Sequence, residues 1–371
     1  MNICGPMGKR MVIGPETWRS WLPLLAGAGL MAAAPFVLSD FKVILLSEVV
    51  IFALFAVSYN LLLGYCGLVS FGHAALFGLG GYTLALLLAK TGAPFLAALV
   101  AAPVLGAAAA LVMGFLALRL AQIYFALFTL AVGQIAWSVA NKWVSFTNGD
   151  DSLAVAATSI PDPISSPGSV SLYFFIVAIV AAALLVLYLV VNSAFGYTLQ
   201  AIRENPTRAE FVGVPVRHYR LLAFVISGFF AGLAGGLFAV HNHFVHPEML
   251  FWLLGAQVLL MSLLGGVHLF WGPALGAGLV VYLRDSVQGV FPELTEKHLG
   301  QILTLEGLTL GAAALVVAIF FPLGVGGMLQ RAARLATMRL GSRGNAPSEG
   351  QASGSPVLHG PVAAEEPRDR S

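Results

Sequence analysis

Long apolar segments separated by short polar ones run through most of the chain. A helix needs about twenty mostly apolar residues to cross a bilayer. The segments that meet this length approximately are 21–38, 43–63, 72–89, 94–118, 120–140, 172–192, 220–242, 250–267, 270–290 and 303–322. The pattern therefore predicts an all-α, polytopic membrane bundle of about ten transmembrane helices.

Composition supports this class and excludes others. Hydrophobic residues make up 58% of the chain and charged residues only 10%, and the mean hydropathy is +0.88. Soluble domains carry roughly 25% charged residues, so a soluble fold does not fit. A net charge of +2 gives no reason to expect nucleic-acid binding.

The basic residues predict the orientation. With the N-terminus inside, the outer segments hold only Lys42, Lys90, Lys142 and Lys297, and the inner segments hold most of the remaining Lys and Arg. This asymmetry follows the positive-inside rule and predicts that both termini are cytoplasmic. Arg284 lies inside a span beside Asp285, and we expect the two to satisfy each other or to reach outward.

The segments group into three regions. Residues 1–20 are expected to be a cytoplasmic N-terminal segment, 21–325 the transmembrane domain, and 326–371 a cytoplasmic tail. The tail is rich in Gly, Ser, Pro and Glu, so it cannot bury enough apolar surface to offset the entropy cost of ordering, and we expect it to be disordered.

One long polar segment, 194–219, interrupts the apolar pattern in the second half of the domain. Together with the adjoining Arg220 it carries four arginines, two glutamates and two prolines. We interpret it as a short helix on the cytoplasmic face through which a separate protein moves the membrane helices. The alternative is a plain inner loop whose basic residues only set the topology.

Glycines concentrate in a second informative segment, NLLLGYCGLVSFGHAALFGLGGY (60–82). A partly similar segment, with its own Gly-Gly pair and histidine, is MSLLGGVHLFWGPALGAGLVVY (261–282). In membranes such glycines allow either close helix packing or a break that lines a polar pathway. Taken with its polar residues, the cluster favours a translocation pathway. The candidate pathway residues are Asn60, Ser70, Phe71, Gly72, His73, Gly78, Gly81, Tyr82, Gly265 and Gly266.

Other polar residues within the spans leave alternatives open. His73 could contact a solute or move a proton, or it could simply bond to a neighbouring carbonyl. Glu48 is costly in lipid and is expected to face the bundle interior. His241, His243 and Glu248 are unlike a zinc site because they do not share one helical face, so no metal is expected.

Catalytic motifs are absent from the sequence. It contains no G-x-x-x-x-G-K-[ST] phosphate loop, no H-E-x-x-H and no G-x-S-x-G. The spans also hold few buried charges on which an ion gradient could act. We therefore expect no enzyme, and an external energy source.

Three motifs carry a resemblance to a known family: GLVSFGHAALFGLGGY (67–82), AIRENPTRAEFVGVPVRHYRLLAFVISGFFAGLAGGLFA (201–239) and FVHPEMLFWLLGAQVLLMSLLGGVHLFWGPALGA (244–277). In this order and spacing they resemble the larger permease subunit of ABC importers for branched-chain amino acids. The resemblance covers about 42–322.

This resemblance implies a complex in the bacterial inner membrane with a second permease chain, two cytoplasmic ATP-binding subunits and an extracytoplasmic solute-binding protein. ATP and Mg would be used by the partner ATPase subunits, and this chain would bind no cofactor. Residues 201–213 would form the coupling helix that docks in an ATPase cleft. The residues implied in coupling are Ala201, Arg203, Glu204, Asn205, Arg208, Ala209 and Gly213.

Two other functions remain open from the sequence. A permease of the same architecture could carry urea, short amides or another small solute. A self-sufficient channel or secondary carrier would instead transport without any ATPase, and the coupling segment argues against it.

Overall fold

The computed structural model describes residues 39–120, 122–155, 160–162, 164–166 and 169–290, with the short pieces 34–35 and 311. The chain divides into two units, Met1–Leu329 and Gln330–Ser371, and all described residues belong to the first. The predicted N-terminal segment and tail lie outside the described residues, as do the spans 21–38 and 303–322 except for those short pieces.

Six helices within the described ranges are long and apolar enough to cross a membrane. They are α2 (Asp40–Asn60) with its extension η1 (Leu61–Cys66), α3 (His73–Leu86) with η2 (Leu87–Thr91), α4 (Phe95–Ala117), α5 (Gln122–Lys142), α7 (Val170–Val191) and α10 (Val216–Asn242). α11 (Trp252–Gly265) and α12 (Gly272–Val290) follow. Each lies where an apolar segment predicted a helix, so the all-α class is confirmed.

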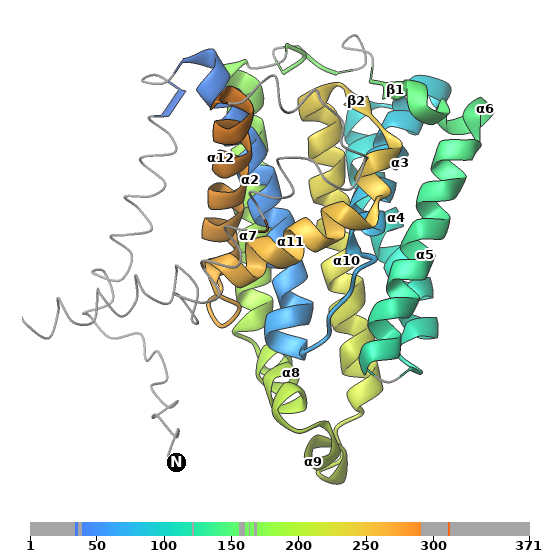
Figure 1. Cartoon of the computed structure of the whole chain (residues 1–371), viewed down its shortest axis with the longest axis vertical. Coiled ribbons are helices and arrows are strands. Elements are labelled where there is room, and N and C mark those ends of the chain that lie inside the picture. Colours follow the sequence, from blue (N-terminus) through green and yellow to red (C-terminus); the bar gives the residue numbers. More distant parts are fainter. Residues whose placement is uncertain are drawn as a thin grey trace, which may run out of the picture. The chain divides into compact units, whose positions relative to one another are not determined.

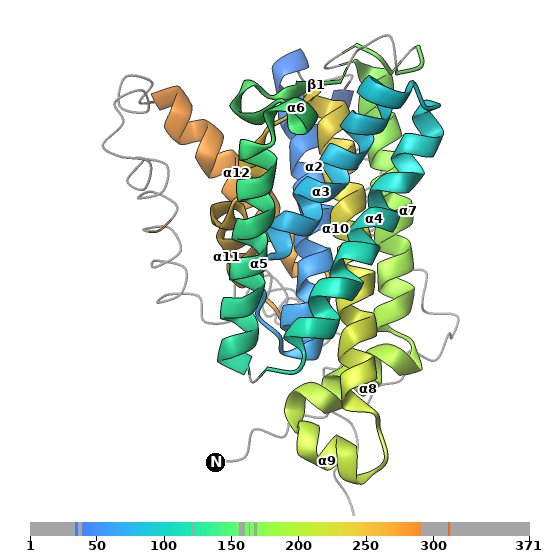
Figure 2. The ribbon, with the colours of Figure 1, turned by 90° about the vertical axis from the view of Figure 1, so that its right-hand side faces the viewer.

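α10 is the central helix of the bundle. It packs against α3, α4 and α2, and α2 in turn packs against α7, α11 and α12 (Figures 1 and 2). α5 lies at the side, against α3 and α4. The helices that surround α10 are therefore the ones that any movement of α10 would displace.

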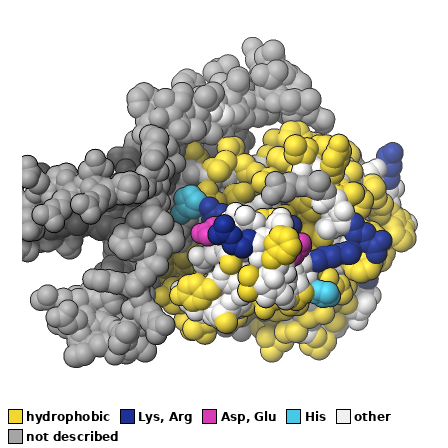
Figure 3. Space-filling model, turned by 90° about the horizontal axis from the view of Figure 1, so that it is seen from below, with side chains coloured by type: hydrophobic (Ala, Val, Ile, Leu, Met, Phe, Trp, Pro, Cys, Tyr) yellow, Lys and Arg dark blue, Asp and Glu magenta, His cyan; other side chains and the backbone are white. Residues whose placement is uncertain are grey.

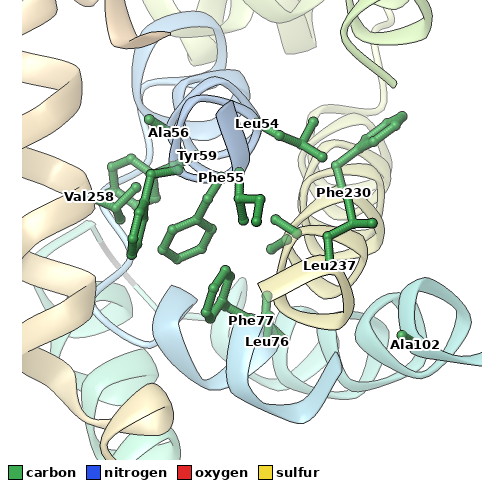
Figure 4. Close-up of a cluster of buried hydrophobic side chains, with 14 of the residues drawn as sticks. Leu54, Phe55, Ala56, Tyr59, Leu76, Phe77, Ala102, Phe230, Leu237 and Val258 are labelled. Atoms are coloured by element: carbon green, nitrogen blue, oxygen red, sulfur yellow. The ribbon is translucent and has the colours of Figure 1, made fainter. Parts of the chain in front are cut away.

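Aromatic side chains fill the space between α2, α3 and α10. Phe55 and Phe77 point toward each other with ring centroids 4.6 Å apart, and Tyr59 lies one turn further along α2 (Figure 4). Phe238 of α10 packs on Phe77 at 5.5 Å. Since dispersion and close packing hold helices together in lipid, this cluster fixes the spacing of the three helices.

Glycines allow α10 to approach both of its neighbours closely. A Cβ added to Gly235 would overlap the carbonyl oxygen of Phe77 in α3, and one on Gly80 would overlap backbone atoms of Gly232. On the side facing α4, a Cβ on Gly106 would lie 2.6 Å from the carbonyl oxygen of Gly228. Backbone contact on both faces explains the small residues in SGFFAGLAGG better than helix propensity does, because glycine weakens a helix.

The two ends of the bundle differ. At one end α8 (Ala194–Glu204) and α9 (Pro206–Phe211) project from the helices (Figure 1). The other end holds α6 (Val144–Thr147), η3 (Gly149–Asp151) and two strands. β1 (Leu153–Ala154) pairs antiparallel with β2 (Phe244–Val245), which ties the loop after α5 to the loop after α10. Positive-inside sorting predicts that the α8–α9 end is cytoplasmic.

Candidate functional site

The first feature of the site is a break between α2 and α3. η1 ends at Cys66, Gly67 adopts the left-handed conformation at φ 73°, and α3 begins only at His73. His73 stacks on Phe55 with ring centroids 5.6 Å apart, so α3 starts beside the middle of α2 and not at its end. The glycine-rich segment 60–82 therefore contains the break that the sequence predicted.

A second break lies between α10 and α11. η5 (Pro247–Leu250) is a short 3₁₀ turn, and α11 has only 14 residues, about 21 Å of helix. α11 lies within the predicted span 250–267 but is shorter than the roughly 20 residues that cross a bilayer. Apolarity predicts where a buried helix lies and does not fix its length.

The two broken segments contact each other. A Cβ on Gly255 of α11 would lie 2.6 Å from the carbonyl oxygen of Phe71, which precedes α3. On η5, the carbonyl oxygen of Met249 lies 3.0 Å from a Cβ built on Gly78. Residues from both halves of the chain therefore meet inside the bundle, as in transporters whose solute sites lie between discontinuous helices.

His73 is buried and has a definable hydrogen-bond role. Ser227 of α10 donates from Oγ to the carbonyl oxygen of Ser58 at 2.5 Å, and the same Oγ lies 3.2 Å from Nε2 of His73. Since the hydroxyl has one proton, it accepts from His73, which assigns the proton to Nε2. Nδ1 is then left as a buried acceptor without a partner in this structure. This arrangement joins α2, α3 and α10, and of the two readings of His73 it supports the hydrogen-bonding one.

Ser227→Ala is expected to lower the stability of the protein by about 1–3 kcal/mol, because it leaves the buried Nε2–H of His73 without an acceptor. Thermal unfolding of the detergent-solubilised protein, followed by loss of the monodisperse peak, measures this. Ser193→Ala is the matched control, since its hydroxyl bonds only to the carbonyl of Val190 on an exposed turn. Equal melting temperatures for the two variants would contradict the role given to Ser227.

Of the other predicted pathway residues near the first break, Asn60, Ser70 and Gly72 are buried and Phe71 is half-buried. Asn60 is 1% exposed and Ser70 is fully buried, and Asn60 Nδ2 reaches the carbonyl of Leu269 at 3.5 Å. Among the described residues, neither Ser70 Oγ nor the hydroxyl of Tyr82 further along α3 has a hydrogen-bond partner. A Cβ on Gly72 would overlap the carbonyl oxygen of Thr129 in α5. In this conformation these positions are packed.

The remaining pathway candidates lie at two other helix contacts. Gly81 packs against Gly235 of α10, where an added Cβ would lie 3.1 Å from a carbonyl oxygen. Gly265 and Gly266 form the end of α11, where Gly266 adopts φ 103° and the chain turns back into α12. The structure therefore brings the α3 glycines Gly78 and Gly81 to η5 and α10. Gly266 begins the turn that Gly64 approaches, where an added Cβ would lie 2.5 Å from the carbonyl oxygen of Val267.

The polar segment forms two helices and not the single helix expected over 201–213. α8 ends at Glu204, and Asn205 caps α9 by accepting from the backbone N–H of Arg208 at 2.9 Å. Pro206 takes the first position of α9, which suits its fixed φ and missing N–H. Gly213 at φ 90° then turns the chain toward α10. The Asn-Pro pair signals this break because asparagine is a preferred N-cap.

The proposed coupling residues divide by exposure. Six of the seven are exposed and Ala209 is buried in a small cluster with Ile202 and Val216; the exposed ones are Ala201, Arg203, Glu204, Asn205, Arg208 and Gly213. Arg203 turns its guanidinium toward the helix bundle. Two residues that the sequence analysis did not single out are the most exposed apolar ones of the segment: Phe211 at 87% and Val212 at 79%. A large apolar side chain within a polar segment, as at Phe211, is the sequence feature that could have identified them.

Charged groups lie unevenly on the described surface. Seen from the α9 end, basic side chains lie beside hydrophobic ones, with few acidic side chains (Figure 3).

Within the bundle, Arg284 of α12 forms an ion pair with Glu48 of α2, a partner that the sequence did not suggest. At the end opposite α9, Nδ1 of His246 lies 3.9 Å from the carboxylate of Glu248. Burial lowers the pKa of His246 by more than the nearby Glu248 raises it. No group of three or more His, Cys, Asp or Glu among the described residues could hold a metal.

Apolar spanning helices, with two discontinuous segments that meet among them, define a multi-pass membrane permease. Comparison with known proteins identifies the family. The chain belongs to the family described as "Branched-chain amino acid transport system / permease component", which it matches over residues 42–320.

Curated relatives agree with this family. The high-affinity branched-chain amino acid transport system permease protein LivM of Escherichia coli (strain K12) is 28% identical over 331 residues, covering 82% of this chain and 77% of LivM. LivM of Salmonella typhimurium is also 28% identical with the same coverage. The autoinducer 2 import system permease protein LsrC of Klebsiella pneumoniae is 32% identical over 105 residues, 28% of this chain and 30% of LsrC. No solved structure matches.

The chain is therefore an ABC importer permease, a transport subunit and not an enzyme. The family implies partner ATPase and permease subunits.

Proposed function

We propose that this chain is the permease subunit through which an ATP-driven importer moves branched-chain amino acids across the bacterial inner membrane. The similarity to LivM supports this solute because it extends over 82% of the chain, whereas the similarity to LsrC covers 28%. Leucine, isoleucine and valine are the solutes to test first.

The observation that carries the ATP-driven mechanism is the α8–α9 projection with its exposed apolar tip. Phe211 and Val212 are the two most exposed large hydrophobic residues in the part of the chain that the structure describes. Exposed aromatic side chains beside arginine are typical centres of protein interfaces. Their position at the predicted cytoplasmic end supports docking of an ATPase subunit there.

In this proposal the two broken segments lie beside the solute path. Binding of ATP by the partner would shift α8 and α9, and α10 would move with them because it follows α9 directly in the chain. α10 contacts α3 through Gly235 and Gly80, so its movement would displace the first break. Rigid-body movement of packed helices is a common way to alternate access.

The complete importer in this proposal contains a second permease chain, two ATP-binding subunits and an extracytoplasmic solute-binding protein. The binding protein selects the solute, and ATP with Mg is bound by the ATPase subunits and not by this chain. Residues at the end with α6, β1 and β2 would face the binding protein.

Co-purification from the native membrane tests the proposed assembly, and the solute retained by the binding protein tests the substrate. The proposal predicts two ATPase copies and a second permease with this chain, and uptake of labelled leucine that excess isoleucine or valine inhibits. Inhibition by urea or a short amide, with no effect of isoleucine and valine, would assign another solute to the same architecture. Purification of the chain without ATPase would contradict the assembly.

A further inference from the structure

Arg203 lies in the last turn of α8, the position from which a long side chain can reach the helix bundle. α8 packs against η1, the last turn of the α2 segment. The guanidinium of Arg203 donates to the carbonyl oxygen of Gly64 and lies with Nη2 3.1 Å from Nδ1 of His268. Its Cγ would lie 3.1 Å from a Cβ built on Gly67. One side chain of the coupling segment therefore touches two different parts of the bundle.

The Gly64 carbonyl is available because a helix ends there. η1 closes with the N–H of Gly67 and the N–H of Leu68 both bonded to the carbonyl of Leu62, so the carbonyl of Gly64 comes after the last one that the helix uses. The final carbonyls of a helix lack intrahelical donors and carry partial negative charge. A guanidinium satisfies both needs, so Arg203 caps the α2 segment at the start of the first break.

The His268 contact reaches the other discontinuous segment. His268 lies in the turn between α11 and α12, which begins at Gly266. Burial and the neighbouring Arg203 lower the pKa of His268, so its imidazole is neutral near pH 7 and Nδ1 can accept a hydrogen bond. Asn60 reaches the same turn, through the carbonyl of Leu269. The α11–α12 turn thus lies beside the end of the α2 segment, and Arg203 of α8 contacts both of them.

We propose that Arg203 is a positioning residue that links the coupling segment to the predicted cytoplasmic ends of both discontinuous segments, and not a contact for the ATPase. This inference rests on the proposed function. Movement of α8 would pull the Gly64 carbonyl and the His268 turn together, so the end of the α2 segment and the end of α11 would respond to one event. Arg203 is exposed as well, but its guanidinium is held by Gly64 and His268. The docking surface belongs instead to α9, where Arg208 and Phe211 are exposed.

The donor geometry of arginine suits this role. A guanidinium has five N–H donors in a fixed plane, so it can serve two acceptors at once, whereas the lysine ammonium is a point charge on a flexible chain. No carboxylate among the described residues lies within 4.0 Å of Arg203, so its contacts are the carbonyl and the imidazole and not an ion pair. Since the His268 bond is solvent-exposed, losing it is expected to cost little stability.

The test compares Arg203→Met with Arg208→Met in the complete importer, reconstituted in proteoliposomes. Three quantities are measured: ATPase subunits retained, ATP hydrolysed, and labelled leucine taken up per ATP. Arg203→Met is expected to retain the ATPase at the wild-type level and to reduce uptake per ATP about tenfold. Arg208→Met is expected to retain less ATPase, with uptake per bound ATPase unchanged.

Two further variants keep the test informative if Arg203→Met does not fold. Arg203→Lys keeps the charge and a donor for Gly64 and is expected to recover part of the coupling. His268→Phe removes only the second acceptor and is expected to lower uptake per ATP while Arg203 is intact. Combining it with Arg203→Met should add nothing further, since both changes break the same bond.

Two results would overturn the inference while leaving the importer function intact. Loss of the ATPase from Arg203→Met would make Arg203 a docking residue. Wild-type uptake per ATP in both Arg203→Met and His268→Phe would make the contacts incidental. If the wild-type complex itself hydrolyses no ATP during uptake, the proposed function fails first.

Discussion

Gly235→Ala is expected to destabilise the bundle more than any other single methyl addition considered above. The added Cβ would overlap the carbonyl oxygen of Phe77 and lie 3.2 Å from the backbone nitrogen of Gly81, so backbone must move on α3 or α10. Overpacking of a well-packed interior typically costs about 1–3 kcal/mol. Gly235→Leu should exceed this and prevent recovery of monodisperse protein. Thermal unfolding in detergent measures the first effect and expression yield the second.

Gly278→Ala is the matched control for this prediction. Gly278 also lies within an apolar helix, α12, but within the part of the chain that the structure describes its added Cβ would meet only Val49, at an ordinary 3.6 Å. Alanine is favoured over glycine in helix interiors by about 1 kcal/mol, so this variant should be neutral or slightly more stable. If both alanine variants melt at the wild-type temperature, the close approach of α10 and α3 is not what holds the bundle.

Phe211→Asp is expected to remove most of the affinity for the ATPase subunits. The side chain is 87% exposed at the end of α9, so replacing it disturbs few contacts within this chain. Aromatic residues at the centre of an interface often contribute 2 kcal/mol or more, which corresponds to roughly 30-fold in affinity. An aspartate would also have to be desolvated in the interface. Retention of ATPase subunits on the immobilised permease, at a series of salt concentrations, measures the loss.

Phe211→Leu is the control because it keeps an apolar side chain at the same position. It is expected to retain most of the ATPase, and both variants should melt at the wild-type temperature when the permease is purified alone. Wild-type ATPase retention by Phe211→Asp would show that the projection does not dock through its tip.

Hydrophobic pattern predicted the helices well because each needs a long apolar segment to be stable in lipid. The pattern predicted 94–118 as a span, for example, and α4 occupies Phe95–Ala117. It was less exact at 250–267, where α11 occupies only Trp252–Gly265 and follows the turn η5. Hydropathy is averaged over many residues, so it does not show where a single residue turns the backbone.

Local chemistry predicted some features of the site and not others. The glycines of 60–82 indicated the first break. The pair Asn205-Pro206 also indicates a helix start, which is where α9 begins after α8. The contacts of Arg203 with Gly64 and of Arg284 with Glu48 join residues more than 130 positions apart, and no single sequence reveals such pairs. The sequence shows the charge of Arg203 but not its contacts with Gly64 and His268, so it cannot distinguish a docking residue from a positioning residue.

The most direct test of the importer mechanism is leucine uptake into proteoliposomes that contain this permease with its partner permease and binding protein, with and without the ATPase subunits. The account predicts uptake against a gradient only when both the ATPase subunits and ATP with Mg are present, and none when Phe211→Asp replaces the wild type. Equal uptake without the ATPase subunits would contradict it, because the chain would then be a self-sufficient channel or carrier.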